Sequence, residues 1–187
     1  MQDQKRGVME DTVKFALIAL LIVVPIRWFV AQPFVVKGAS MEPTFQNGDY
    51  LIVDQLSYRF HPPERGDVII MRYPKDPTVF FIKRIIGLPN ETVELVGSRI
   101  VIQKSGAPAI TLDQSFLDPS RVSDEYGVYT LNSDEYFVLG DNRNASSDSR
   151  SWGVLGEDEI VGRAWIRAFP VDRLGVIDFN RPGFVSL

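Results

Sequence analysis

Residues 79–87 read Val79-Phe80-Phe81-Ile82-Lys83-Arg84-Ile85-Ile86-Gly87, an apolar run rich in β-branched residues with a lysine near its centre. This composition is typical of a β-strand. Because side chains alternate between the two faces of a strand, Lys83 shares a face with Phe81 and Ile85. A lysine on an apolar face loses water, which lowers its pKa and makes it a candidate general base. The alternative is an edge-strand lysine that stays in water and discourages aggregation.

Similar short apolar runs occur on both sides of this stretch, separated by Gly, Pro, Asn and Asp. They span residues 50–53, 68–71, 92–96, 100–102, 136–139 and 160–168. The runs 92–96 and 100–102 flank Gly97-Ser98, which predicts a β-hairpin. No run is followed by a segment with room for a long helix, so parallel βαβ units are not expected. We therefore predict a mainly β protein with an antiparallel sheet, in which the polar, poorly patterned residues 105–132 form an irregular insertion.

The N-terminal segment differs sharply from the rest. Every residue from Phe15 to Ile26 is apolar, and the run continues past Arg27 to Ala31. As a helix, these 17 residues would be roughly 25 Å long, close to the thickness of a bilayer core. We expect residues 1–32 to form a short tail and a transmembrane anchor, and residues 33–187 to form one β-rich catalytic domain.

Other interpretations of this segment are a cleavable signal peptide, a buried core helix and a transit peptide. Cleavage after Ala31 would place bulky Phe29 where a small residue is wanted, and the acidic residues of the first 11 positions do not suit a transit peptide. Basic residues precede the span at Lys5, Arg6 and Lys14, which mildly favours a cytoplasmic N-terminus and an extracytoplasmic domain.

Composition limits the chemistry. The 187 residues include one histidine and no cysteine, so a cysteine nucleophile, a disulfide framework and a thiolate metal site are excluded. We find no ligand set for a metal and no need for a cofactor. The net charge of −4, without a basic cluster, gives no reason to expect nucleic-acid binding. A serine nucleophile with a desolvated lysine as its base is the chemistry that remains.

The candidate serine is Ser40, in the segment Gly38-Ala39-Ser40-Met41-Glu42-Pro43-Thr44 just beyond the apolar span. Pro43 disfavours helical geometry at the preceding residue, so the segment is expected to be an extended or turn structure. It is not the nucleophile elbow of α/β hydrolases, because Glu42 stands at the second glycine position. A loop serine bonded to local backbone is the alternative.

A third polar segment, Gly140-Asp141-Asn142-Arg143-Asn144-Ala145-Ser146-Ser147-Asp148-Ser149-Arg150, follows the run 136–139. It could be a turn with solvated charges. It could also offer a hydroxyl that orients an amine, with Asp148 and Arg150 paired behind it. A calcium loop is disfavoured because the spacing does not fit.

In this order the segments resemble type I signal peptidases, membrane-bound Ser-Lys proteases that remove signal peptides. The single apolar span and the short length resemble the compact bacterial form, anchored in the plasma membrane. The resemblance covers nearly the whole chain and includes the span, the Ser40 segment, Gly48-Asp49, Arg65-Gly66-Asp67-Val68, Lys83-Arg84-Ile85-Ile86-Gly87, the loop 140–150 and Gly162-Arg163-Ala164-Trp165.

The resemblance implies roles for individual residues. Ser40 would be the nucleophile, Lys83 the general base, and Ser146 the serine that orients the lysine amine. Asp141, Asp148 and Arg150, next to Gly140, would form the supporting polar network. Met41 would lie beside the substrate pocket, and Val36 and Ile82 would line shallow pockets for small side chains. The implied substrates are preproteins cleaved after Ala-x-Ala-like sites at the surface of a lipid bilayer.

The sequence departs from the family at a few positions. Gly38 stands where some members carry a serine that assists the oxyanion hole, so the hole must rely on backbone N–H, expected from Ser40. Ala145 replaces an asparagine often found before Ser146. Asn90 replaces a glycine in the turn after Leu88-Pro89, and asparagine tolerates the left-handed conformation.

Three alternatives stay open. A self-cleaving Ser-Lys repressor would carry a soluble DNA-binding domain in place of the apolar span. A mitochondrial or plastid processing peptidase would share the chemistry but would require a transit peptide. A membrane-tethered β domain without catalytic activity would leave Lys83 with an ordinary pKa.

Overall fold

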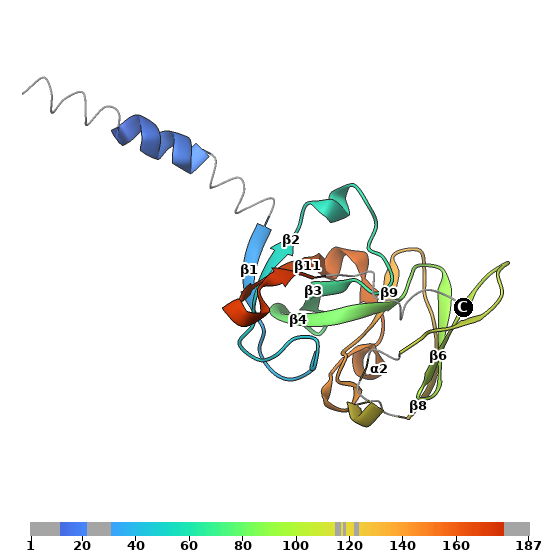
Figure 1. Cartoon of the computed structure of the whole chain (residues 1–187). Coiled ribbons are helices and arrows are strands. Elements are labelled where there is room, and N and C mark those ends of the chain that lie inside the picture. The colour runs from blue at the N-terminus through green and yellow to red at the C-terminus, as the bar shows by residue number, and fades with distance from the viewer. Residues whose placement is uncertain (1–11, 22–30, 115–116, 118, 122–123, 178–187) are drawn as a thin grey trace, which may run out of the picture.

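The computed structural model describes residues 12–21, 31–114, 117, 119–121 and 124–177. The strands form two antiparallel sheets (Figure 1). The larger sheet has the order β1-β2-β11-β3-β4-β9-β10, with β12 paired to β11, and the smaller has the order β7-β6-β5-β8. The strands are β1 Ala31–Val35, β2 Tyr50–Asp54, β3 Val68–Tyr73, β4 Asp76–Gly87, β5 Glu91–Gly97, β6 Arg99–Lys104, β7 Ile110–Thr111, β8 Glu125–Thr130, β9 Glu135–Leu139, β10 Leu155–Gly156, β11 Ile160–Phe169 and β12 Gly175–Val176.

In the described residues after position 30, helical structure is limited to short turns between strands. They are the 3₁₀ turns η2 Ser57–Arg59, η3 Pro119–Arg121, η4 Arg143–Ala145, η5 Glu157–Glu159 and η6 Val171–Arg173, and the single-turn helix α2 Ser149–Trp152. Residues 12–21 are also helical. Among the residues that the structure describes, no helix is long and apolar enough to span a membrane. Residues 22–30 of the predicted anchor lie outside the described residues, so the anchor stays a prediction. Its predicted end at residue 32 is wrong, because Ala31 and Gln32 pair with β2 as part of β1.

The prediction of an antiparallel, mainly β fold is confirmed. All seven apolar runs are strands, and the runs on either side of Gly97-Ser98 form the β5–β6 hairpin. Asn90 has a φ of 64°, the left-handed conformation expected there. The strand β1 was not predicted, because Pro33 lies within it. Since β1 pairs only with β2, it is an edge strand, where a proline is tolerated.

The prediction that residues 105–132 are irregular throughout is wrong for the part that forms strands. Residues 125–130 form β8, which pairs along its length with β5, and residues 110–111 form β7. The apolar side chains of Tyr126 and Val128 point outward and are strongly exposed, while Glu125 and Tyr129 are half-buried. The usual alternation of apolar and polar side chains is therefore inverted, and so β8 carries no recognisable strand pattern.

The second half of β4, which carries Lys83, is buried and packed on both faces. β4 contributes one buried isoleucine to each of three hydrophobic clusters: Ile82, Ile85 and Ile86. The Ile82 cluster lies under the loop that follows β1, and the Ile86 cluster joins the two sheets. At the end of β4, a side chain on Gly87 would collide with Val93 and Leu131 of this second cluster. Tight packing of this kind leaves little freedom for the backbone around Lys83.

Candidate active site

Ser40 lies in the turn between β1 and β2. The base of this turn is closed by hydrogen bonds from the Val36 N–H to the Asp49 carbonyl and from the Gly48 N–H to the Val36 carbonyl, both 2.9 Å. Gly38 has a φ of +89°, a left-handed conformation that favours glycine, and its N–H donates to Asn47 Oδ1 at 3.0 Å. These hydrogen bonds hold the backbone of the turn in place. Ser40 lies within the turn and is half-buried.

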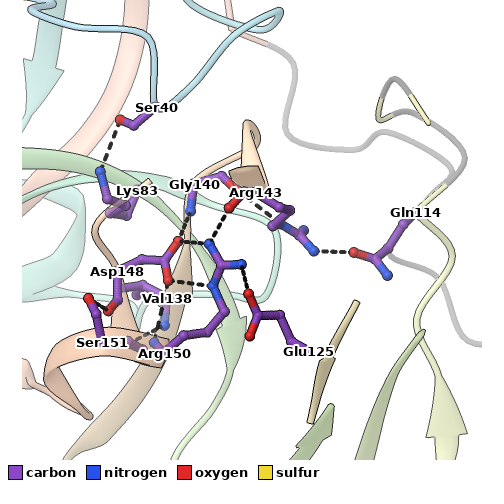
Figure 2. A network of polar contacts seen from close by, with 11 residues as sticks. Ser40, Lys83, Gln114, Glu125, Val138, Gly140, Arg143, Asp148, Arg150 and Ser151 are labelled. Carbon is purple, nitrogen blue, oxygen red and sulfur yellow. Dashed lines mark hydrogen bonds and ion pairs between the residues drawn. The ribbon is translucent and has the colours of Figure 1, made fainter. Parts of the chain in front are cut away.

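Lys83 reaches Ser40 from β4 (Figure 2). Its Nζ donates to Ser40 Oγ at 3.1 Å and to the Ile82 carbonyl at 2.8 Å, and it lies 5.0 Å from the centre of the Phe81 ring. Only 3% of Lys83 is exposed. Burial lowers the pKa of Lys83 to about 8, although the charges of Asp148 and Asp141 oppose this shift. At that pKa about a tenth of Lys83 is a neutral amine at pH 7, able to accept a proton from Ser40.

The loop 140–150 lies behind Lys83 and is organised by a fully buried carboxylate (Figure 2). Asp148 accepts a hydrogen bond from the Gly140 N–H at 3.0 Å and two from Arg150, each 2.8 Å. Arg150 also donates to the Arg143 carbonyl at 2.7 Å. The predicted pairing of Asp148 with Arg150 is thus present. Together with the contacts to Gly140 and Arg143, it joins the two ends of the loop.

Asp141 belongs to a different pair. Its fully buried carboxylate accepts two hydrogen bonds from Arg84 on β4, at 2.8 and 2.6 Å, and one from Thr44 Oγ1 at 2.6 Å. It therefore ties the Ser40 turn to the Lys83 strand. The sequence analysis missed Arg84 and Thr44 as site residues, because nothing local to either residue points to a partner so distant in the chain.

Asn142 was also missed. Its backbone N–H donates to the Ser40 carbonyl at 3.0 Å, and its Nδ2 donates to the Ala39 carbonyl at 3.1 Å. Asn142 thus binds the carbonyls of the two peptide groups that flank Ser40. These residues are separated by more than 100 positions, so no sequence spacing could have indicated the contact.

Ser146 lies in the same loop, and its Oγ is buried. No hydrogen-bond partner for this oxygen occurs among the described residues. Its predicted contact with the Lys83 amine is therefore not formed here, and its role stays a prediction. The position is nevertheless crowded, because a side chain on Gly140 would overlap both Ser146 Oγ and the Ser40 carbonyl oxygen.

A groove of about 430 Å³ opens beside the Ser40–Lys83 pair. Val36 and Ile82 line it, as predicted for substrate-binding residues, and Ala145 and Ser147 form part of its wall. Met41 does not line it: only 1% of Met41 is exposed, and its side chain packs in the cluster beneath the groove. Met41 therefore lies under the floor of the groove, and its predicted part in substrate binding stays a prediction.

Residues 9–169 match the family described as signal peptidase, peptidase S26. The chain belongs to this family. It is 39% identical over 172 residues to the signal peptidase I of Leptolyngbya laminosa, covering 88% of this chain and 82% of the relative. It is 31% identical over 178 residues to signal peptidase I P of Bacillus subtilis subsp. natto, covering 92% and 96%. The crystal structure of a signal peptidase I from Enterococcus faecalis is 27% identical, with a TM-score of 0.39 over 55% of this chain and 97% of that one.

Membership of the signal peptidase family makes this protein a hydrolase, a serine endopeptidase whose substrates are preproteins. In the part of the chain that the structure describes, no group of three or more His, Cys, Asp or Glu side chains is arranged to hold a metal ion.

The crowding at Gly140 gives a first prediction for this signal peptidase. In Gly140→Ala, the added methyl group must displace the Ser40 carbonyl or Ser146, so we expect kcat/KM for preprotein cleavage to fall about 100-fold. Measuring both cleavage and thermal unfolding of the variant would distinguish a loss of activity in the folded protein from a loss of the fold. Gly175→Ala, at a glycine with open space around it and without a left-handed backbone, is the matched control. Wild-type activity in Gly140→Ala would show that the close approach of the loop to Ser40 is not required.

Proposed function

We propose that this signal peptidase removes N-terminal signal peptides through an acyl-enzyme, with Ser40 as the nucleophile and Lys83 as the general base. The observation that carries the proposal is the 3.1 Å separation between Lys83 Nζ and Ser40 Oγ at the wall of the groove. A base within hydrogen-bond reach of a hydroxyl is the geometry that activates a serine. The burial of Lys83 supports the neutral state that this role needs.

The reaction would proceed in two steps. The neutral Lys83 amine accepts the Ser40 proton as Oγ attacks the scissile carbonyl, and the ammonium then protonates the leaving amine of the mature protein. The signal peptide remains as an ester on Ser40. Lys83, neutral again, takes a proton from water, which attacks the ester and frees Ser40.

The oxyanion that forms in each step needs hydrogen-bond donors. The Ser40 N–H forms no hydrogen bond with any of the described residues, whereas the Gly38 N–H is occupied by Asn47. We assign the Ser40 N–H as the oxyanion donor. The Asn142 contacts with the two neighbouring carbonyls fix the orientation of this part of the backbone.

The supporting residues hold these parts in place. Asp141, through Arg84 and Thr44, joins the Ser40 turn to β4, and the Asp148–Arg150 pair closes the loop behind Lys83. Ser146 is assigned the role of orienting the Lys83 amine once substrate is bound.

Substrate selection would follow from the groove. Val36 and Ile82 stand beside the dyad and leave shallow space that suits small side chains, in keeping with Ala-x-Ala-like cleavage sites. Met41 supports the floor from below.

The proposed setting is the surface of a plasma membrane. Residues 1–30 would form a cytoplasmic tail and a single transmembrane anchor, and residues 31–187, which begin with β1, an extracytoplasmic catalytic domain. The apolar run from Phe15 to Ala31 supports this assignment. Anchoring would confine the enzyme and the emerging preproteins to one surface, with the lipid bilayer as a partner. We propose no metal, cofactor or nucleic acid.

The test is cleavage of a preprotein with an Ala-x-Ala site in detergent–lipid micelles, measured from about pH 6 to about pH 10. Protonated Lys83 cannot accept the Ser40 proton, so we expect kcat/KM to rise with pH through an apparent pKa of about 8. Ser40→Ala should abolish cleavage at every pH. A profile that is flat through this range would remove Lys83 as the base. Undiminished activity of Ser40→Ala would remove the nucleophile, and an inactive wild type with lipid present would favour a binding domain.

A further inference from the structure

The segment between β6 and β9 contacts the loop 140–150 from outside the dyad (Figure 2). Among the described residues, three hydrogen bonds donated by side chains of the loop join them. Arg143 Nη1 donates to Gln114 Oε1, Asn144 Nδ2 donates to the Ser120 carbonyl at 2.9 Å, and Arg150 Nη1 donates to Glu125 Oε1 at 3.1 Å.

Gln114 is itself held in place. It lies between two buried leucines, Leu112 and Leu117, of which Leu112 packs in the cluster that joins the two sheets. Its amide Nε2 donates to the Ser98 carbonyl at 2.8 Å, which leaves its Oε1 directed toward Arg143. Glu125 is the first residue of β8 and is fixed by the pairing of that strand with β5. Both acceptors therefore belong to the scaffold of the small sheet.

Arg143 depends on such an acceptor. The residue is buried, and its Nη2 has no hydrogen-bond partner among the described residues. Burial lowers the pKa of Arg143 to about 10, which shows how poorly its charge is solvated. Arg143 Nε donates to the Gly140 carbonyl at 2.9 Å, while the Gly140 N–H donates to Asp148. A chain of contacts thus runs from Gln114 through Arg143 to Gly140, beside Ser40.

Arg150 carries the second chain of contacts. On one side of its guanidinium, Nε and Nη2 donate hydrogen bonds to the Asp148 carboxylate. On the other side, Nη1 donates to Glu125 Oε1. Since a guanidinium is planar and rigid, anchoring Nη1 fixes the plane in which Asp148 is held. Asp148 is one of the two carboxylates whose charge acts on Lys83.

We infer that Gln114 and Glu125 are positioning residues for the reaction: through Arg143 and Arg150 they hold the loop 140–150 against Lys83. This role rests on the proposed Ser-Lys function. It also gives the small sheet a part in the chemistry, although it contributes no group to the dyad.

The charged surroundings of Lys83 determine what loosening the loop would do. The charges of Asp148 and Asp141, both in this loop, raise the Lys83 pKa. Arg84, on the same strand as Lys83, is paired with Asp141. Lys37 lines the groove on the Ser40 side. Burial is the largest influence on the Lys83 pKa. The loop contributes to this burial, because its residues Ala145 and Ser147 form part of the groove wall beside Lys83. A loosened loop admits water, so the Lys83 pKa moves up toward its ordinary value.

The test uses the full chain in detergent–lipid micelles and a preprotein with an Ala-x-Ala site. In Gln114→Leu and in Glu125→Leu, we expect the acid limb of the kcat/KM profile to move to higher pH. A rise of about one pH unit lowers the neutral fraction of Lys83 at pH 7 about ten-fold. Gln114→Glu keeps an acceptor oxygen for Arg143 but loses the amide that donates to the Ser98 carbonyl, so it should shift the profile less than Gln114→Leu does. Gln103→Leu is the matched control, because Gln103 is in the same sheet but donates only to the carbonyls of Lys104 and Ala107.

A second readout does not depend on activity. Amide hydrogen exchange of residues 138–150 should quicken in Gln114→Leu and Glu125→Leu but not in Gln103→Leu, while β4 stays protected. A loss of activity that is uniform with pH, or unchanged exchange in this loop, overturns the positioning role. If the wild type fails to cleave, or Ser40→Ala still cleaves, the proposed function fails and the exchange result alone decides whether the small sheet holds the loop.

Discussion

Replacing Lys83 by alanine is expected to lower preprotein cleavage by about 10⁴-fold, the size of effect seen when a member of a catalytic unit is removed. Among the described residues, no second amine is hydrogen-bonded to Ser40 Oγ, and Lys37, the other lysine that lines the groove, is exposed. The measurement is kcat/KM for a preprotein with an Ala-x-Ala site in detergent–lipid micelles. Lys83→Met, which fills a similar volume with an uncharged side chain, should be equally inactive.

Lys75→Ala is the control for this experiment. Lys75 is exposed in the turn between β3 and β4, so it precedes the same strand but does not enter the site. It should keep wild-type activity. Thermal unfolding of all variants shows whether the protein remains folded. Cleavage at the wild-type rate by a folded Lys83→Ala would show that another group is the base.

Replacing Asp141 by alanine is expected to lower the free energy of unfolding by about 3–5 kcal/mol. Asp141 is fully buried, and its loss leaves the guanidinium of Arg84, only 3% exposed, without its carboxylate. Thr44 loses its acceptor as well. Urea unfolding at pH 7 measures the change, and activity should fall with it, since the Ser40 turn is no longer tied to β4.

Two further variants make this prediction specific. Glu94→Ala, at an exposed position on β5, should change stability by no more than about 0.5 kcal/mol. The double replacement Arg84→Met with Asp141→Leu removes both charges and should recover much of the lost stability but not the activity. If Asp141→Ala alone unfolds at the wild-type urea concentration, the pair does not hold the two segments together.

The strands were predictable because most of them have the residue composition that a partly buried sheet requires. The runs around Val53, Ile70 and Val138 are apolar, β-branched and bounded by turn residues, so their burial follows from their composition. β8 shows where this logic fails, since Tyr126 and Val128 face outward. No local rule can identify a strand whose partner, β5, determines which side is buried.

The site was predictable only in part. Ser40 and Lys83 stand out because their chemistry is unusual for their surroundings. Arg84 does not, because strand alternation places it opposite Lys83, and its importance appears only once Asp141 is seen to bind it. The same is true of Asn142, whose contacts with the Ser40 turn depend entirely on tertiary structure.

The position of β11 has a consequence for the order in which a newly made chain becomes a protease. β11 lies between β2, which follows the Ser40 turn, and β3, which pairs with the Lys83 strand. A nascent chain that has not yet reached residue 160 already contains both members of the dyad but lacks the strand that joins their halves of the sheet. We therefore expect a nascent chain to become an active peptidase only after β11 has been synthesised.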